Sequence, residues 1–342
     1  MRVKLEDVCE RGSSNLKQSD VVEMAGNYPI YGASGYIGNV DFYHQEKPYV
    51  AVVKDGAGIG RTTLHPAKSS VIGTMQYLLP KDNVLPQYLY YVVSYMHLEK
   101  YFTGATIPHI YFKDYKNEKF NLDSLDKQKE IIESLGRCEK VIESRKQELQ
   151  LLDELIKARF VEMFGDPVSN SHELPEATLP ELGEFGRGVS KHRPRNDPRL
   201  LGGEYPLVQT GDVANASLYI MSYNSTYSEL GLKQSKMWSK GTLCITIAAN
   251  IAKTAILEFD ACFPDSVVGF IANEKTNNIF IHYWFSFFQA ILESQAPESA
   301  QKNINLKILS ELKVIVPEKE KQNEFVDFVD QVNKSKFINQ LL

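Results

Sequence analysis

The segment Asp126-Lys127-Gln128-Lys129-Glu130-Ile131 occurs a second time as Glu320-Lys321-Gln322-Asn323-Glu324-Phe325. The same distance along the chain separates Ile110 from Ile304 and Leu122 from Val316. A globular stretch followed by a helix is therefore predicted to be used twice.

Farther upstream the two copies agree with small gaps. Val71-Ile72-Gly73 matches Val267-Val268-Gly269, and Tyr28-Pro29-Ile30 matches Tyr205-Pro206-Leu207. We predict a tandem repeat of the α/β (α+β) class with four segments: residues 1–122 and 167–316 are globular modules, residues 123–166 a central spacer helix, and residues 317–342 a short C-terminal helix. Two similar modules on rigid connectors suit a protein that reads two sites at a fixed separation.

Composition is compatible with two ordinary domain cores, because the chain has 342 residues of which 43% are hydrophobic. No apolar run of about 18 residues and no secretory leader is apparent, so we expect a cytoplasmic location. The four cysteines are far apart and lack a matching histidine pair, which argues against a zinc site and against a disulfide framework.

The formal net charge is -5, and acidic and basic residues nearly balance in each predicted segment. A local basic cluster lies in the early part of the second module, where Asp197 alone opposes it. Its residues are Arg187, Lys191, Arg193, Arg195 and Arg199. Gly188, Pro194 and Pro198 predict a loop here. The cluster is either a solvated surface loop or a phosphate-contacting one.

The central helix has apolar residues that alternate at spacings of three and four, which is typical of a coiled-coil seam. Asp123-Ser124 can cap its start, and Gly165-Asp166-Pro167 should end it. The repeat supplies a partner helix, so an antiparallel pair within one chain is expected; a dimeric coiled coil between two chains is the alternative. The predicted seam residues are Ile131, Leu135, Ile142, Leu149, Leu152, Ile156, Phe325, Val329 and Val332.

The second helix is too short to cover the whole of the first. We therefore expect an exposed apolar remainder around Leu149, Leu152 and Ile156, and either the C-terminus is truncated or another protein covers this remainder. Within the modules, residues 48–53 and 241–247 are predicted as buried strands that enter turns, and residues 86–99 and 278–294 as aromatic-rich helices packed on them.

Catalytic motifs are sparse. The segment Asp55 to Arg61 is rich in glycine but lacks the spacing of a phosphate-binding loop, and no Asn-Pro-Pro-Phe or Asp-Pro-Pro-Tyr methyltransferase motif is present. Pro264-Asp265 with Glu311-Leu312-Lys313 is only a loose match to a metal-dependent nuclease. The histidines have no paired nucleophile. No catalytic residue and no metal ligand is predicted.

These features resemble the specificity subunit of type I restriction-modification systems over nearly the full chain. The most specific marks are the Asp-Lys-Gln and Glu-Lys-Gln helix starts and the spacer end Phe160-Val161-Glu162-Met163-Phe164-Gly165-Asp166-Pro167. Gly104-Ala105-Thr106 before the first helix and Ala300-Gln301-Lys302 before the second are also similar.

The resemblance implies a non-catalytic reader of double-stranded DNA. Each module would contact one half of a split target, and the helices would fix the gap between the halves. Two methyltransferase subunits would use S-adenosylmethionine, and a restriction subunit would use ATP and Mg; this chain would bind none of these cofactors. A stand-alone metal-dependent nuclease and a coiled-coil protein scaffold without DNA binding remain as alternatives.

Candidate DNA contacts are polar and basic residues on glycine-bounded loops, which can approach a groove. In the first module they are Lys54, Arg61, Lys68, Thr103, Thr106 and His109. In the second they are Lys191, His192, Arg193, Arg195, Gln209, Thr210, Lys253, Gln301 and Lys302. Replacing Arg193 and Arg195 by alanine is predicted to weaken DNA binding and to make its salt dependence shallower.

Overall fold

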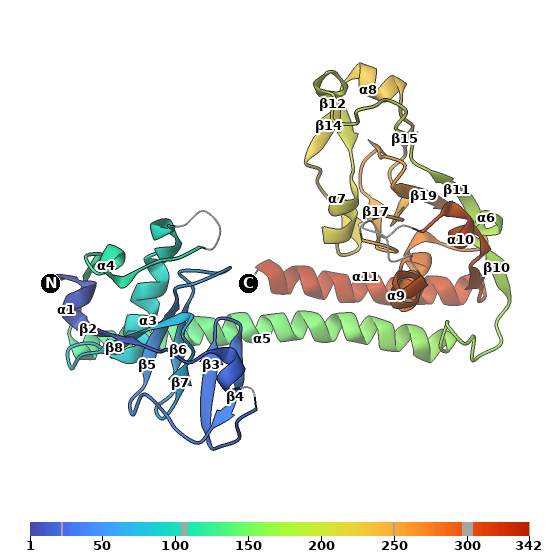
Figure 1. The fold of residues 1–342 in the computed structure, drawn as a ribbon. Coiled ribbons are helices and arrows are strands. Elements are labelled where there is room, and N and C mark those ends of the chain that lie inside the picture. Colours follow the sequence, from blue (N-terminus) through green and yellow to red (C-terminus); the bar gives the residue numbers. More distant parts are fainter. Residues whose placement is uncertain (22, 104–107, 249, 296–303, 342) are drawn as a thin grey trace. The chain divides into compact units, whose positions relative to one another are not determined.

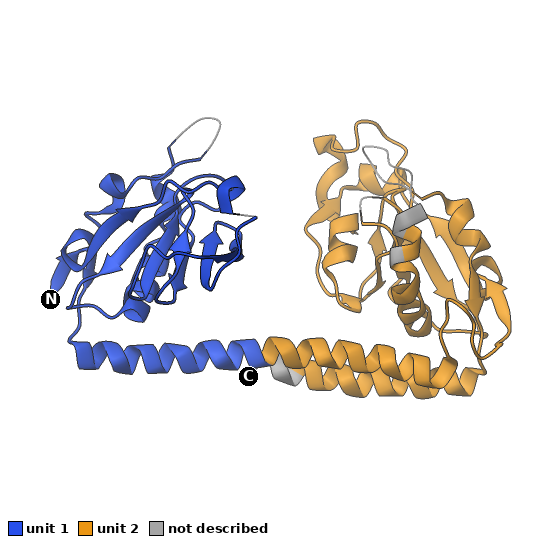
Figure 2. Ribbon diagram, turned by 60° about the horizontal axis from the view of Figure 1, so that its bottom comes forward, with its two compact units in different colours: residues 1–144 blue, residues 145–342 orange. Residues whose placement is uncertain are grey.

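The computed structural model describes residues 1–342 except 22, 104–107, 249, 296–303 and 342. The chain forms two compact units, Met1–Ser144 and Arg145–Leu342, which Figure 2 colours separately. The boundary lies within the long helix α5 (Leu125–Phe164). Within the described ranges, no helix has both the length and the apolar character that crossing a membrane requires.

The elements of unit 1 that precede α5 are shown in Figure 1. They are β1 (Arg2–Lys4), α1 (Leu5–Val8), β2 (Cys9–Ser13), α2 (Gln18–Val21), β3 (Tyr28–Gly32), β4 (Gly35–Val40), β5 (Tyr49–Val53), β6 (Thr62–His65), β7 (Ser70–Val71), β8 (Met75–Pro80), α3 (Pro86–Tyr95), the 3-10 helix η1 (Leu98–Tyr101), α4 (Phe112–Tyr115) and β9 (Lys119–Asn121).

Strand β5 is the centre of unit 1 and is buried on both faces. Val50 and Val52 pack with Leu89 and Val93 of α3, whereas the alternate residues Tyr49, Ala51 and Val53 pack with Met75 and Tyr77 of β8. Because successive side chains of a strand point to opposite faces, covering both faces requires an uninterrupted apolar run. This burial confirms the predicted strand and explains its sequence.

In unit 2 the elements are β10 (Glu176–Thr178), α6 (Leu179–Leu182), β11 (Gly183–Arg187), the 3-10 helix η2 (Pro198–Leu200), β12 (Leu201–Leu207), α7 (Thr210–Asn215), β13 (Tyr219–Ile220), β14 (Ser225–Tyr227), α8 (Glu229–Lys233), β15 (Met237–Trp238), β16 (Leu243–Thr246), β17 (Thr254–Leu257), β18 (Ala261–Cys262), β19 (Val267–Ala272), α9 (Asn278–Gln295), α10 (Leu306–Glu311), β20 (Lys313–Ile315) and α11 (Lys319–Leu341).

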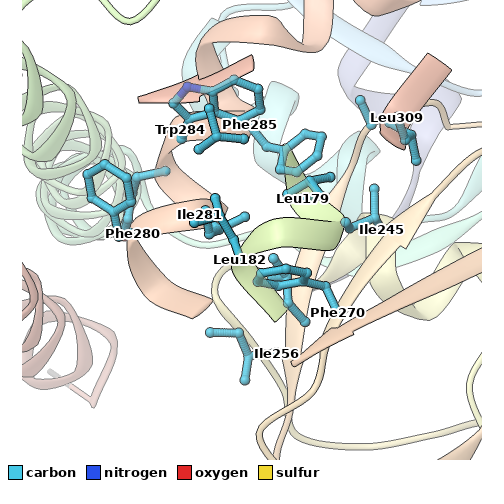
Figure 3. Close-up of a cluster of buried hydrophobic side chains, with 14 of the residues drawn as sticks. Leu179, Leu182, Ile245, Ile256, Phe270, Phe280, Ile281, Trp284, Phe285 and Leu309 are labelled. Carbon is cyan, nitrogen blue, oxygen red and sulfur yellow. The ribbon is translucent and has the colours of Figure 1, made fainter. Parts of the chain in front are cut away.

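The two units repeat one topology. The sheet β2-β8-β5-β6 corresponds to β11-β19-β16-β17-β13, the sheet β4-β3-β7 to β14-β12-β18-β15, and the pair β1-β9 to β10-β20. In unit 2 the strand β16 is the buried centre: Leu243 and Ile245 face the cluster that contains Phe280, Ile281 and Trp284 of α9. Figure 3 shows this cluster, with Leu179, Leu182 and Leu309 contributed from α6 and α10.

Strand pairing corrects one part of the sequence repeat. Val71 ends β7, which runs parallel to β3, and in unit 2 the strand parallel to β12 is β18, which ends at Cys262. Val267 belongs to β19, the counterpart of β8. The match of Val71-Ile72-Gly73 to Val267-Val268-Gly269 is therefore wrong, because the apolar pattern of one strand resembles that of the next.

Helices α5 and α11 pair antiparallel within unit 2. Lys336 forms an ion pair with Asp153, whereas the Phe325 ring lies 5.3 Å from that of Phe160, so later residues of α11 meet earlier residues of α5. Ile156, Phe325 and Val329 are fully buried and Val332 is nearly so, and Leu152 packs against the same core. Gly165, with φ +76°, ends α5 in the left-handed conformation that glycine favours.

The exposed apolar residues of α5 differ from those expected. Ile156 is buried, so the prediction of an uncovered remainder there is wrong. Leu135 and Ile142, nearer the start of α5, are 40% and 55% exposed, while Ile131 packs partly against the core of unit 1. Antiparallel pairing causes this difference, because α11 starts beside the end of α5 and its described contacts extend back to Asp153.

A buried glutamine fastens each spacer helix to its module. Gln128 donates through Nε2 to the carbonyls of Asn83 and Asp123 at 3.0 and 2.9 Å, and its Oε1 accepts from the Leu85 N–H at 2.8 Å. Leu85 is the residue that caps α3. Gln128 therefore orients the spacer helix against the module.

Buried His65 should make the stability of unit 1 depend on pH. Burial lowers the pKa of His65 to about 4, and its ring stacks on Tyr49 with centroids 5.2 Å apart. Between pH 6.5 and 4 the unfolded chain binds a proton that the folded unit excludes, so the free energy of unfolding should fall by up to about 1.4 kcal/mol per pH unit as pH decreases. Urea unfolding at several pH values measures this; His65→Phe should flatten the dependence, whereas His97→Asn, at an exposed position, should leave it unchanged.

Candidate nucleic-acid interface

In unit 1, the turn between β5 and β6 lies against the segment that leads to α4. The N–H of Ile110 donates to the Lys54 carbonyl at 2.9 Å, and the N–H of Gly56 donates to the Pro108 carbonyl at 2.9 Å. His109 Nδ1 is 2.6 Å from Asp55 Oδ1. These bonds bring Lys54 and His109 together, although they lie far apart in the sequence.

The tip of this turn is open. Gly56 and Gly58 have φ values of +90° and +96°, which L side chains rarely adopt, and a Cβ added at Gly56 would have no neighbour within 4 Å. Arg61 is exposed and donates to the Ala33 carbonyl, so its guanidinium is tied to the turn between β3 and β4. A backbone this open can approach a ligand closely.

Unit 2 repeats the same arrangement. The N–H of Ile304 donates to the Ile247 carbonyl at 3.0 Å, as Ile110 does to Lys54. The Lys253 carbonyl accepts from the N–H of Thr246 at 2.9 Å, as the Arg61 carbonyl accepts from Val53 at 2.9 Å. Ala252, with φ +57°, occupies the left-handed position that Gly60, with φ +82°, has in unit 1.

Arg61 and Lys253 are thus structural counterparts, each following a buried strand and a left-handed residue. Both are candidate DNA contacts from the sequence, but a gap in the alignment of the two copies hides their equivalence. The turn is one residue shorter in unit 2, which shifts the register of the repeat.

The basic loop of unit 2 is held by carboxylates. Arg193 and Arg195 both contact Asp265, Arg193 at 3.5 Å, and Arg193 also donates to the Ser190 carbonyl at 2.6 Å. Arg199 lies 2.7 Å from Asp197, and its hydrogen bonds hold the pKa of that carboxyl well below the usual range. Arg193 and Arg195 remain about half exposed, so the loop presents an ordered guanidinium surface.

Part of this loop lines a recess of about 310 Å³ in unit 2. Arg195, Gln209 and Thr210 meet there with Ser190 and Tyr227. Gln209 also donates through Nε2 to Ser225 Oγ at 3.3 Å. Residues that the sequence placed on two separate loops therefore share one polar surface.

The remaining candidates are dispersed. Lys68, exposed with φ +54°, follows the opposite end of β6 from Arg61. The N–H of Lys191 and that of His192 donate to the carbonyl and side-chain oxygens of Gln234 at 3.4 and 3.0 Å. Thr103 is exposed and pairs with His109 through the backbone. Thr106, Gln301 and Lys302 lie outside the described residues.

Sequence reasoning missed the carboxylates in these surfaces. For Asp55 a signal was available, because this residue follows a buried strand and Lys54, which was already a candidate contact. For Asp265 no local signal exists, because its pairing with Arg193 joins segments that are far apart in the sequence. Asp265, weighed as a nuclease residue, is held by arginines, and Glu311 lies 3.7 Å from Lys307. Carboxylates accept from cytosine amino groups and arginines donate to guanine, so both can read bases in a major groove.

Comparison with known proteins agrees with the repeat. The model of the type I restriction modification DNA specificity domain matches residues 1–154 and 176–342. A putative type I restriction enzyme specificity subunit, MjaX, from Methanocaldococcus jannaschii is 21% identical over 280 residues. That match covers 77% of this chain and 66% of the relative, which is slightly less than two thirds of its length.

Solved structures share the fold. The S subunit of a type I restriction-modification system from M. genitalium superposes with a TM-score of 0.61 at 16% identity, covering 99% of this chain and 91% of that one. A chain from a study of complex assembly and conformational transition of the type I system has a TM-score of 0.57 at 14% identity, with 99% and 91% covered. From the two matched ranges and the repeated topology, this chain belongs to the family of type I restriction modification DNA specificity domains.

Proposed function

We propose that this chain is the DNA-reading specificity subunit of a type I restriction-modification complex. Each unit would read one half of a bipartite double-stranded target, and α5 with α11 would fix the unread gap. The observation that carries the proposal is a repeated backbone pairing between the turn after the buried central strand and the segment before the spacer helix, at Lys54 and Ile110 in unit 1 and at Ile247 and Ile304 in unit 2.

This duplication fits a split target better than a single binding surface. Two units of one fold with different side chains on equivalent turns would recognise two different half-sites by the same geometry. Asp55 and Arg61 in unit 1 give way to Ala248 and Lys253 in unit 2, so the hydrogen-bonding groups differ. Base readout depends on such donor and acceptor patterns.

The catalytic steps would belong to partner subunits. Two methyltransferase subunits docked along the spacer helices would supply S-adenosylmethionine chemistry on adenine, and a restriction subunit would use ATP and Mg. The exposed Leu135 and Ile142 on α5 offer apolar surface for such docking. The chain itself would be non-catalytic and would act in the cytoplasm, where the DNA is.

Methylome sequencing tests the proposal. Cells that express the neighbouring methyltransferase with this chain should carry methyladenine at a two-part motif that is absent when the methyltransferase is expressed alone. A soluble complex without new methylation would contradict the specificity role and favour the scaffold alternative. Cutting of DNA by the purified chain with magnesium alone would favour the nuclease alternative.

The arginine pair gives a sharper prediction. Arg193→Ala combined with Arg195→Ala should weaken DNA binding and reduce the slope of log affinity against log salt by up to about two, because each phosphate contact contributes about 0.9. Fluorescence anisotropy at several salt concentrations measures the slope. The double lysine variant keeps both charges and should retain it. An unchanged slope in the alanine variant would refute the assignment.

A further inference from the structure

A second recess of about 350 Å³ lies entirely within unit 2. Its walls come from α5, α9 and α11, from α7 and the loop after it, and from the turn between β16 and β17 with the start of β17. Lys157 and Asp153 belong to α5, Lys336 to α11, and Lys253 to the turn that is the counterpart of the Arg61 turn. The recess thus lies between the spacer helices and the Lys253 turn, which is a candidate DNA contact.

The charges in this recess favour an anion. Three ammonium groups, those of Lys157, Lys253 and Lys336, line it together with one carboxylate, Asp153. The Lys336 side chain is only 15% exposed and contacts Asp153, whose own side chain is 65% exposed. In the described part of the chain, no ion pair is recorded for Lys157 or Lys253. The lining therefore carries a net positive charge that the protein does not neutralise.

Histidine adds no charge to this balance at neutral pH. Burial lowers the pKa of His282 to about 4, and its Nδ1 lies 2.9 Å from Thr254 Oγ1. The ring therefore serves as a neutral wall fixed to β17. Lysine ammonium groups bind phosphate as point charges, and a partly enclosed site weakens screening by solvent.

We propose that this recess binds a phosphate group through Lys157, Lys253 and Lys336. On binding, Lys336 would exchange its contact with Asp153 for the phosphate oxygens. If the phosphate belongs to a DNA backbone, the inference rests on the proposed function. A backbone phosphate held beside the Lys253 turn would set the register of that turn on the duplex. A free phosphate ion presents the same chemistry.

DNA binding by the full chain, co-purified with its methyltransferase, tests the backbone source. Against a duplex that carries the methylated motif, Lys157→Gln combined with Lys253→Gln should weaken binding and reduce the salt slope by up to about 0.9, which is the contribution of one neutralised phosphate. Asp153→Asn should tighten binding, since Lys336 would no longer have to leave its ion pair with Asp153. Lys240→Gln is the matched control, because Lys240 lies at the other end of β16 and pairs with Glu258 at 2.7 Å.

Thermal unfolding in inorganic phosphate tests the free-ion source. If free phosphate binds, it should raise the unfolding temperature more than chloride of equal ionic strength, and Lys157→Gln should abolish the difference. Either result supports phosphate binding in the recess. A change in the salt slope identifies a DNA backbone as the source, and the effect on the unfolding temperature identifies a free phosphate ion. If neither effect is seen in variants that remain folded, the proposal is overturned. A wild-type complex that binds no DNA would refute the proposed function instead, and the phosphate measurement would still decide the recess.

Discussion

Phe160→Ala is expected to lower the free energy of unfolding of unit 2 by about 3 to 5 kcal/mol. Phe160 is fully buried at the place where α5, α9 and α11 meet. Its ring centroid lies 5.0 Å from Phe164, 5.2 Å from Phe280 and 5.3 Å from Phe325. Truncation would remove these contacts and leave a cavity that three helices cannot close, because each is held by other buried residues.

Urea unfolding monitored by hydrogen exchange would resolve the two units, so that unit 1 serves as an internal reference. Val161→Ala, at the next position of α5 where the side chain is 39% exposed, is the matched control and should change stability by less than about 1 kcal/mol. Equal stability of Phe160→Ala and the parent chain would show that the helix pair does not support unit 2.

Gln128→Leu should destabilise the junction of unit 1 with its spacer helix by about 3 kcal/mol or more. The leucine would leave the carbonyls of Asn83 and Asp123 and the N–H of Leu85 without their partner, and each orphaned buried group costs about 1 to 3 kcal/mol. Gln128 is fully buried, so water cannot replace these bonds without opening the helix start.

The same substitution should affect the spacing of the target. If the glutamine sets the direction in which α5 leaves the module, methylation should extend to motifs whose gap differs by one base pair. Methylome sequencing of the variant measures this, and Lys127→Met, at the exposed preceding position, is the control. A destabilised variant that keeps strict spacing would show that Gln128 contributes to stability alone.

Gln322 provides an independent check in unit 2. It is also fully buried, donates to the carbonyls of Lys275 and Pro317 at 3.0 and 2.8 Å, and accepts from Thr276 Oγ1 at 3.0 Å. Gln322→Leu should therefore destabilise unit 2 as Gln128→Leu destabilises unit 1. This equivalence explains why the repeated segment contains glutamine at an otherwise apolar helix face.

Local patterns in the sequence were enough to determine the tandem repeat, the long helix and the buried central strands. The end of α5 at Gly165 and the burial of β5 follow from residue types and spacing within a few positions. Such features depend on backbone preference and on which faces are apolar, and both are properties of a short segment.

Only the tertiary structure decided which distant groups meet. Asp265 reaches Arg193 and Arg195, and Lys157, Lys253 and Lys336 line one recess, because strands and helices far apart in the chain pack together. The sequence of a basic loop does not show whether its charges face solvent or a carboxylate. The physical reason is that ion pairing depends on distance through space, and the packing of the core fixes that distance.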